Sequence, residues 1–279
     1  MSQTRIAYMP LVTDPEAIPD ESILAATSFA GSLDCDLHVT TFAVDIPDVS
    51  STLGGLVVDI RGLARAAEER SKAESHRLQR LVQGASGSQL SVTCTSRKVA
   101  MGTSTDVATA EARYFDLVVL PWSEESLGAQ EMAQAIIFGS GRPAILVPPR
   151  FRPAILNHIA VAWDASRAAA RALGDVLPLL TKGGRVSVLT VQDDKPLSGS
   201  GLADALAASL EKRGVKATPL EVTPGQKTIA EALQDTALSE GAKVLAMGGF
   251  GHSRIRDFVL GGATKGVLAQ LRLPTLLSH

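Results

Sequence analysis

Short apolar runs alternate along the chain with longer stretches in which apolar residues recur every three or four positions. Residues 117–120 and 244–247 are apolar throughout, as expected for strands that are covered on both faces. The longer stretches have the spacing of amphipathic helices. Because strands that alternate with helices pair in parallel, the pattern predicts an α/β fold built on a doubly wound, Rossmann-like parallel sheet.

The same order of elements occurs twice. Apolar runs predict the first, second, fourth and fifth strands of the two halves at 5–10 and 158–163, 36–44 and 185–192, 115–122 and 242–249, and 142–148 and 273–279. Pro148, Pro149 and Pro153 separate the halves, so we place a boundary near residue 150. We therefore expect two tandem domains of about five strands each, residues 1–150 and 151–279.

Helical spacing is clearest in the segments 62–83, 165–180, 201–214 and 228–241. The segment in the first half, 62–83, is longer than its counterpart 201–214. We expect Gly183, after the segment 165–180, and Gly241, at the end of the segment 228–241, to end these two helices.

Composition and charge exclude several classes of function. With 27 basic and 29 acidic residues, a net charge of −2 and 4% aromatic residues, the chain lacks the basic patch and stacking platform of a nucleic-acid-binding protein. Residues 1–20 do not resemble a signal peptide, and no apolar stretch has the length of a membrane span, so we expect a cytoplasmic protein with no membrane partner. Cys35 and Cys94 form no CxxC pair, which favours reduced, structural cysteines.

Glycines are concentrated in residues 247–268, directly after the predicted strand 244–247. Ligands of open parallel sheets bind beyond the carboxyl ends of the strands. The N–H groups of glycine-rich turns, with the N-terminus of a helix that should begin near Ala263, can surround a phosphate group. Two other phosphate-binding motifs are absent: "TPGQKT" lacks the P-loop spacing, and Arg254 stands where the third glycine of a dinucleotide-binding fingerprint belongs.

This segment resembles the signature of the universal stress protein family, G-x2-G-x9-G followed by Ser or Thr, with Gly248, Gly251 and Gly261 at the glycine positions. The resemblance extends to "IAVAWDASRAAARAL" at 159–173 and to "LPTLLSH" at 273–279, and it covers the chain as two tandem copies. It implies the HUP-type form of the α/β fold and a role in stress response or signalling.

The resemblance also implies an adenine nucleotide as the ligand, ATP or AMP with or without Mg²⁺. Nucleotide-binding members hold the phosphates with the signature glycines and the ribose with the aspartate after the first strand, here Asp164. Apolar residues at the ends of the second and fourth strands, here Val191 and Met247, surround adenine. Gly262 stands where the family has a hydroxyl group, so Thr264 or Ser253 would have to supply that contact.

The complete set of predicted nucleotide-binding residues is Ala162, Trp163, Asp164, Val191, Met247, Gly248, Gly249, Gly251, His252, Ser253, Arg254, Gly261, Gly262, Ala263 and Thr264.

The first half lacks these features. Pro121 and Trp122 align with Gly248 and Gly249, and Leu11 aligns with Asp164. The span 120–143 is also four residues shorter than its counterpart 247–274. We therefore expect the first half to be a scaffold copy and the chain to bind one nucleotide.

Alternatives remain for the residues and for the function. The glycines could form only a tight turn, and Asp164 could cap the following helix. The five histidines show no metal-binding spacing and there is no nucleophile elbow, although Asp257 is an outside candidate for activating water. The main hypothesis is therefore a binding protein; a slow ATP hydrolase or nucleotide transferase and a non-binding structural interaction module are the alternatives.

The closing strands suggest how the halves meet. Members of this family commonly dimerise through their last strand, and a tandem chain contains both partners. We expect 144–148 and 275–279 to join the halves as an intrachain pseudo-dimer, with a further homodimer left open.

Overall fold

The computed structural model describes residues 4–14, 16–47, 60–88, 90–151, 154–192, 201–249 and 262–279. The elements of the first half are β1 (Arg5–Val12), α1 (Asp20–Ala30), β2 (Cys35–Asp45), α2 (Ile60–Ala85), β3 (Val92–Ala100), α3 (Ser104–Ala112), β4 (Leu117–Pro121), α4 (Leu127–Gly139) and β5 (Ala144–Val147). Those of the second half are β6 (His158–Ala162), α5 (Arg167–Val176), the 3-10 helix η1 (Leu177–Leu179), β7 (Arg185–Val191), α6 (Leu202–Lys212), β8 (Lys216–Val222), α7 (Ile229–Ser239), β9 (Val244–Gly248), α8 (Gly262–Ala269) and β10 (Thr275–Ser278).

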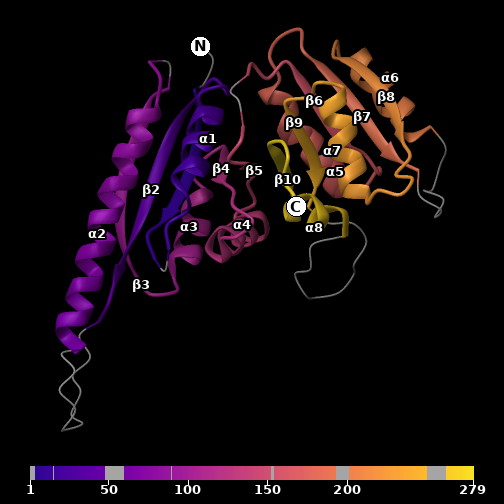
Figure 1. The fold of residues 1–279 in the computed structure, drawn as a ribbon. Helices are drawn as coiled ribbons and strands as arrows, with labels where there is room; N and C mark the ends of the chain where they lie inside the picture. Colours follow the sequence, from indigo (N-terminus) through magenta and orange to yellow (C-terminus); the bar gives the residue numbers. More distant parts are fainter. Residues whose placement is uncertain are drawn as a thin grey trace.

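The strands form one sheet in the order β3-β2-β1-β4-β5-β10-β9-β6-β7-β8 (Figure 1). Within each half all neighbouring strands are parallel, and each half has the same order with its first strand in the middle. β5 and β10 pair antiparallel, with Leu276 opposite Ile145, so the two halves share one sheet. The predicted fold class, two tandem doubly wound α/β units of five strands each, is confirmed.

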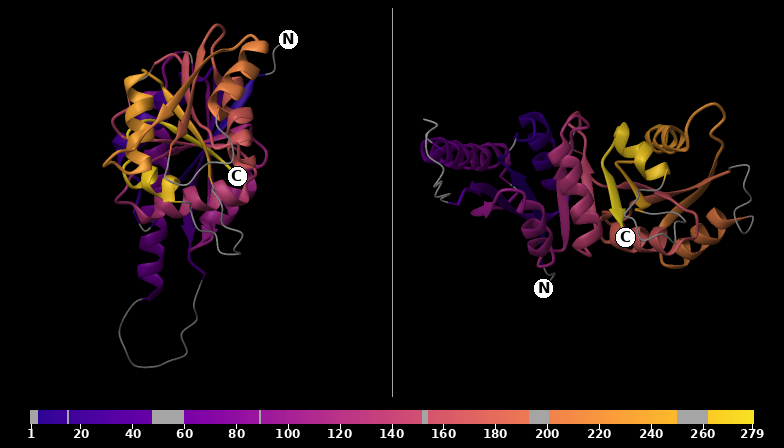
Figure 2. Two further views of the ribbon diagram at one scale, coloured as in Figure 1. Left: turned by 90° about the vertical axis from the view of Figure 1, so that its right-hand side faces the viewer. Right: turned by 90° about the horizontal axis from the view of Figure 1, so that it is seen from below.

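Helices cover both faces of the sheet (Figure 2), and each face has its own apolar cluster. The first cluster lies mainly under α1, α2, α5 and α6, and the second under α3, α4, α7 and α8. Both clusters contain residues from both halves, because the faces continue across the β5–β10 junction. The core is therefore two continuous apolar layers rather than two separate domain cores.

Two strands were not predicted, β3 and β8, and they are the outer strands of the sheet. Much of each strand is exposed or half-buried, because an outer strand has only one neighbour and incomplete helix cover. Polar residues such as Thr93, Ser96 and Arg97 therefore occupy β3, and no apolar run marks the strand in the sequence.

The prediction for the helix ends was right at one position and wrong at the other. Gly241, with φ +78°, follows α7 as expected. α5 ends earlier than predicted, at Val176, because Pro178 cannot continue an α-helix, and η1 follows. Gly183, with φ +81°, instead lies in the turn before β7.

The connection between the halves runs from the end of β5 at Val147 to the start of β6 at His158, and it contains the predicted boundary near residue 150. Cys35 and Cys94 are free thiols, and burial raises the pKa of Cys35 to about 11. Of the helices in the described ranges, none combines the length and apolar character needed to cross a bilayer.

Candidate functional site

The carboxyl ends of β6, β7 and β9 meet at one edge of the second half, because these strands are parallel neighbours. The Trp163 N–H donates to the Leu189 carbonyl oxygen at 2.7 Å, and the Thr190 hydroxyl donates to the Trp163 carbonyl oxygen at 3.1 Å. These bonds hold the chain after β6 against the end of β7. The structure thus brings Ala162 and Trp163 close to Val191, as the sequence predicted for a strand-end site.

The side chains at this edge are divided between the two faces of the sheet. Ala162, Val191 and Met247 belong to the apolar layer under α7 and α8, whereas Trp163 packs into the layer under α5 and α6. Met247 is only 4% exposed. Most of its surface is therefore committed to the core.

Asp164 is half-buried where the chain turns from β6 into α5. Its Oδ1 atom accepts the Ser166 N–H at 2.9 Å, and none of the described residues donates to its Oδ2 atom. Ser166, not Asp164, caps α5, because the Ser166 Oγ atom accepts the Ala169 N–H at 3.1 Å. The prediction that Asp164 might be only a helix cap is therefore wrong, and one oxygen of its carboxylate is without a partner among the described residues.

Gly248 is a glycine for a reason other than ligand binding. A Cβ atom at this position would lie 2.7 Å from the Ala168 Cβ atom and 2.8 Å from the Ala169 backbone nitrogen. The first turn of α5 thus packs directly on the end of β9, which only a residue without a side chain permits. This contact brings the Asp164 turn next to β9.

Gly249 lies at the junction of the two halves. Its N–H donates to the Ser278 carbonyl oxygen at 2.8 Å, which extends the pairing of β9 with β10. A Cβ atom here would lie 3.5 Å from the Ile137 Cγ2 atom of α4. The end of β9 is therefore in contact with a helix of the first half.

The described part of α8 starts at Gly262, next to the predicted position near Ala263. A Cβ atom on Gly262 would have no described atom within 4 Å, and no positive φ requires glycine at this position. Thr264 is 3% exposed, and its hydroxyl donates to the Gly248 carbonyl oxygen at 3.4 Å. This bond places the start of α8 beside the end of β9 and directs the Thr264 hydroxyl toward the strand.

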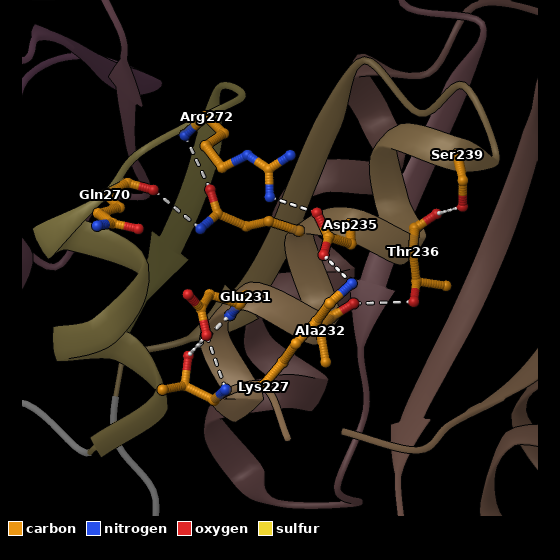
Figure 3. Close-up of polar contacts among 10 residues, drawn as sticks. Lys227, Glu231, Ala232, Asp235, Thr236, Ser239, Gln270 and Arg272 are labelled. Atoms are coloured by element: carbon orange, nitrogen blue, oxygen red, sulfur yellow. Dashed lines mark hydrogen bonds and ion pairs between the residues drawn. The ribbon is translucent and has the colours of Figure 1, made fainter. Parts of the chain in front are cut away.

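The C-terminal end of α8 is fixed by α7 (Figure 3). Gln234 is buried; its Nε2 group donates to the Gln270 carbonyl oxygen at 3.0 Å, and its Oε1 atom accepts the Arg272 N–H at 2.8 Å. On the surface, Asp235 pairs with Lys227 at 2.8 Å and with Arg272, and these two cations lower the pKa of its carboxyl group. The sequence offered no clear signal for this anchor, because a glutamine within a helix is usually exposed.

Several predicted residues lie outside the described residues, namely Gly251, His252, Ser253, Arg254 and Gly261, together with the outside candidate Asp257. Within the described ranges there is no group of three or more His, Cys, Asp or Glu side chains that could hold a metal ion.

The two halves can be matched residue by residue from their hydrogen bonds. The Asp116 N–H, before β4, donates to the Ile6 carbonyl oxygen at 3.1 Å. The Lys243 N–H, before β9, donates in the same way to the His158 carbonyl oxygen at 2.8 Å. Ile6 of β1 therefore corresponds to His158 of β6.

This match corrects one expectation. Counting along the strands from the matched pair makes Val12, not Leu11, the counterpart of Asp164. Leu11 instead corresponds to Trp163. The first half still has no carboxylate at this position.

The strand-end positions of the first half are filled by large side chains. The counterparts of Val191, Met247, Gly248 and Gly249 are Phe42, Leu120, Pro121 and Trp122. Phe42, Leu120 and Trp122 are 1%, 3% and 3% exposed and belong, with Val12, to one apolar cluster. Leu120 and Met247 are both buried, so the halves differ mainly at three positions, where Asp164, Val191 and Gly249 correspond to Val12, Phe42 and Trp122.

Comparison with known proteins agrees with the architecture. Residues 156–279 match the sequence model of the Universal stress protein family. A curated universal stress protein of Synechocystis sp. is 28% identical over 180 residues, an alignment that spans 58% of this chain and 57% of the relative. A universal stress protein structure from Archaeoglobus fulgidus DSM 4304 superimposes with a TM-score of 0.67 over 97% of both chains, at 15% identity. A protein of unknown function from Pseudomonas aeruginosa PAO1 does so with a TM-score of 0.57 over 98% of this chain and 92% of its own, at 14% identity.

Proposed function

We propose that the protein binds one adenine nucleotide at the carboxyl ends of β6, β7 and β9, because residues 156–279 match the sequence model of the Universal stress protein family and the N-terminal half repeats the fold of the C-terminal half. The nucleotide is ATP or AMP, with or without Mg²⁺. The output is binding rather than turnover, in a stress-response or signalling role.

The observation that carries this proposal is the difference between the two sets of strand ends. Phe42 and Trp122 fill the edge of the first half, whereas Val191 and Gly249 occupy the same positions in the second. Packing against α5 already accounts for Gly248, so the support comes from Asp164 and Val191, whose counterparts in the first half are the apolar Val12 and the larger Phe42. A strand-end carboxylate with one oxygen unpaired among the described residues is suited to a polar ligand.

The described residues fit a nucleotide at two points. The Oδ2 atom of Asp164 has no donor among them and is suited to accept a ribose hydroxyl group. The N-terminus of α8, where a side chain on Gly262 would meet no described atom within 4 Å, favours an anion such as a phosphate group. Ala162 and Val191, both half-buried, offer apolar surface for a base.

We also propose that residues 1–150 act as a scaffold copy and residues 151–279 as the binding domain. The antiparallel pairing of β5 with β10 supports an intrachain pseudo-dimer of the two halves. Its contacts reach the site, because α4 of the first half lies against Gly249. The scaffold half would then support the shape of the binding half.

Calorimetric titration of the full chain with ATP and with AMP, in the presence and absence of Mg²⁺, tests this function. We expect one site per chain for at least one of the two nucleotides. Phosphate release measured on the same samples should stay far below roughly one turnover per second, the low end of ordinary enzymes. Two equivalent sites, no binding, or turnover at an enzymatic rate would each refute the proposal.

A further inference from the structure

A groove in the first half is unrelated to the strand ends described above. It has a volume of about 980 Å³ and lies between α3, the amino-terminal part of β2 and the middle of β3. His38, Thr95 and Arg97 form its sheet side, and Ala110, Glu111 and Phe115 form its helix side. Small-molecule sites typically enclose about 300–1,000 Å³, so the groove has the size of a ligand site.

Aromatic rings line the groove. Phe115 stacks on Tyr8 with ring centroids 4.8 Å apart and on His38 with centroids 5.0 Å apart. Burial lowers the pKa of His38, so its imidazole is neutral at neutral pH and serves as a further flat ring. Tyr114 lies at the rim with 86% of its surface exposed. Tyr8 is fully buried behind Phe115, and the parts of His38, Tyr114 and Phe115 that line the groove offer apolar surface to a flat ligand.

Glu111 and Arg97 form an ion pair at the groove, and the Glu111 side chain is much more buried than that of Arg97. The Glu111 side chain is 11% exposed, and its carboxylate accepts hydrogen bonds from the Tyr8 hydroxyl at 3.2 Å and the Thr40 hydroxyl at 3.3 Å. Arg97 approaches Glu111 with its Nε atom at 3.5 Å, and its own side chain is 54% exposed.

These contacts leave the positive charge of the Arg97 guanidinium available to an anion in the groove. Burial, followed by the charge of Glu111, raises the pKa of Tyr8 well above its usual value, so Tyr8 remains a donor to the carboxylate. Glu111 thus accepts hydrogen bonds from two hydroxyl groups, and its closest approach to Arg97 is to the Nε atom. The two terminal nitrogens of Arg97 have no partner among the described residues and can donate to an anion in the groove.

We propose that this groove binds small, flat aromatic compounds that carry one negative charge, with the ring against Phe115 and His38 and the anionic group on the Arg97 guanidinium. The site is separate from the proposed nucleotide site and uses only residues of the first half. The half that we propose to be a scaffold for nucleotide binding thus has a ligand site of its own.

Fluorescence titration of the full chain with 2-naphthoate tests this inference, with the neutral 2-naphthalenemethanol as the comparison ligand. We expect saturable binding of 2-naphthoate that an excess of ATP does not displace. Arg97→Gln should weaken 2-naphthoate binding by about tenfold or more and leave 2-naphthalenemethanol binding unchanged, because only the charged contact is lost.

The chain contains a matched control one residue away. Lys98 is 58% exposed and faces Asp45 and Glu68 on the other side of β3, so Lys98→Gln removes the same charge outside the groove and should bind both ligands normally. Ala110→Trp, on the exposed surface of α3, fills the groove and should abolish binding of both ligands. The proposal is overturned if the parent does not bind 2-naphthoate, if ATP displaces it, if Arg97→Gln binds it like the parent, or if Ala110→Trp still binds.

Discussion

The two halves of this protein have the same strand order but different side chains at the edge where the parallel strands end. In the first half, Phe42 and Trp122 turn that edge into core. In the second half the corresponding positions carry Val191 and Gly249, and Asp164 adds a carboxylate. Repetition of a fold therefore does not repeat the side chains at the strand ends.

The largest expected effect is the loss of stability when the Trp122 side chain is removed from the strand ends of the first half. Trp122→Ala removes a side chain that is 3% exposed, so we expect the free energy of unfolding to fall by about 3–5 kcal/mol. Urea denaturation measures the loss. Nucleotide stoichiometry should stay at one, because Val12 supplies no carboxylate; a second bound equivalent would show that side-chain volume alone separates the two edges.

Adding a side chain at Gly248 in the second half should have the next largest effect on stability. A methyl group at Gly248 would lie 2.7 Å from the Ala168 Cβ atom, so we expect Gly248→Ala to cost about 1–3 kcal/mol of stability. Its control is Gly262→Ala, whose new methyl group would meet no described atom within 4 Å, and this variant should be neutral or slightly stabilising. Thermal unfolding of both variants measures the difference, and equal losses would contradict the proposed contact between α5 and β9.

The Asp164 carboxylate should affect nucleotide binding more than it affects stability. Asp164→Asn keeps an oxygen for the Ser166 N–H but replaces the other with a donor, so we expect nucleotide affinity to fall by about tenfold, the equivalent of roughly 1.4 kcal/mol. Val12→Ala, the matched change in the first half, should lower stability and leave affinity unchanged. Calorimetric titration separates these outcomes, and unchanged affinity in Asp164→Asn would remove Asp164 from the site.

The smallest expected effect is a gain in ATP affinity. Gly262→Ser introduces the hydroxyl group that the family signature has after its last glycine, and a Cβ atom there would meet no described atom within 4 Å. We expect ATP affinity to rise by a few-fold, since a single hydrogen bond contributes about 0.5–1.5 kcal/mol. The same titration measures it. A loss of affinity would place Gly262 too close to the ligand for any side chain.

The sequence was sufficient to predict the fold because the inner strands are covered on both faces and form apolar runs. The outer strands β3 and β8 were missed for the opposite reason, since their exposed positions carry polar residues. The same apolar runs made the register of the inner strands harder to predict. In β1 both faces are buried, so no alternation marked its register, and Asp164 was aligned with Leu11 instead of Val12.

The candidate site was predictable as a location and less so as a set of roles. The Asp164 turn, Gly248 and the start of α8 do come together, as the signature implied. The sequence could not show that Gly248 is needed by α5, because the atoms that exclude its side chain come from another element. Ser166, just before an alanine-rich helix, was a readable N-cap signal, but the capping role was considered only for Asp164.

The β5–β10 junction also bears on how the chain is made. β5 is synthesised with the first half, whereas β10 follows only after the rest of the second half has been translated. Until then, one edge of the nascent sheet offers unpaired N–H and C=O groups to any other strand nearby, as exposed sheet edges do. Translation of the second half therefore sets how long the nascent chain is open to pairing with a neighbouring polypeptide, and the arrival of β10 closes that interval.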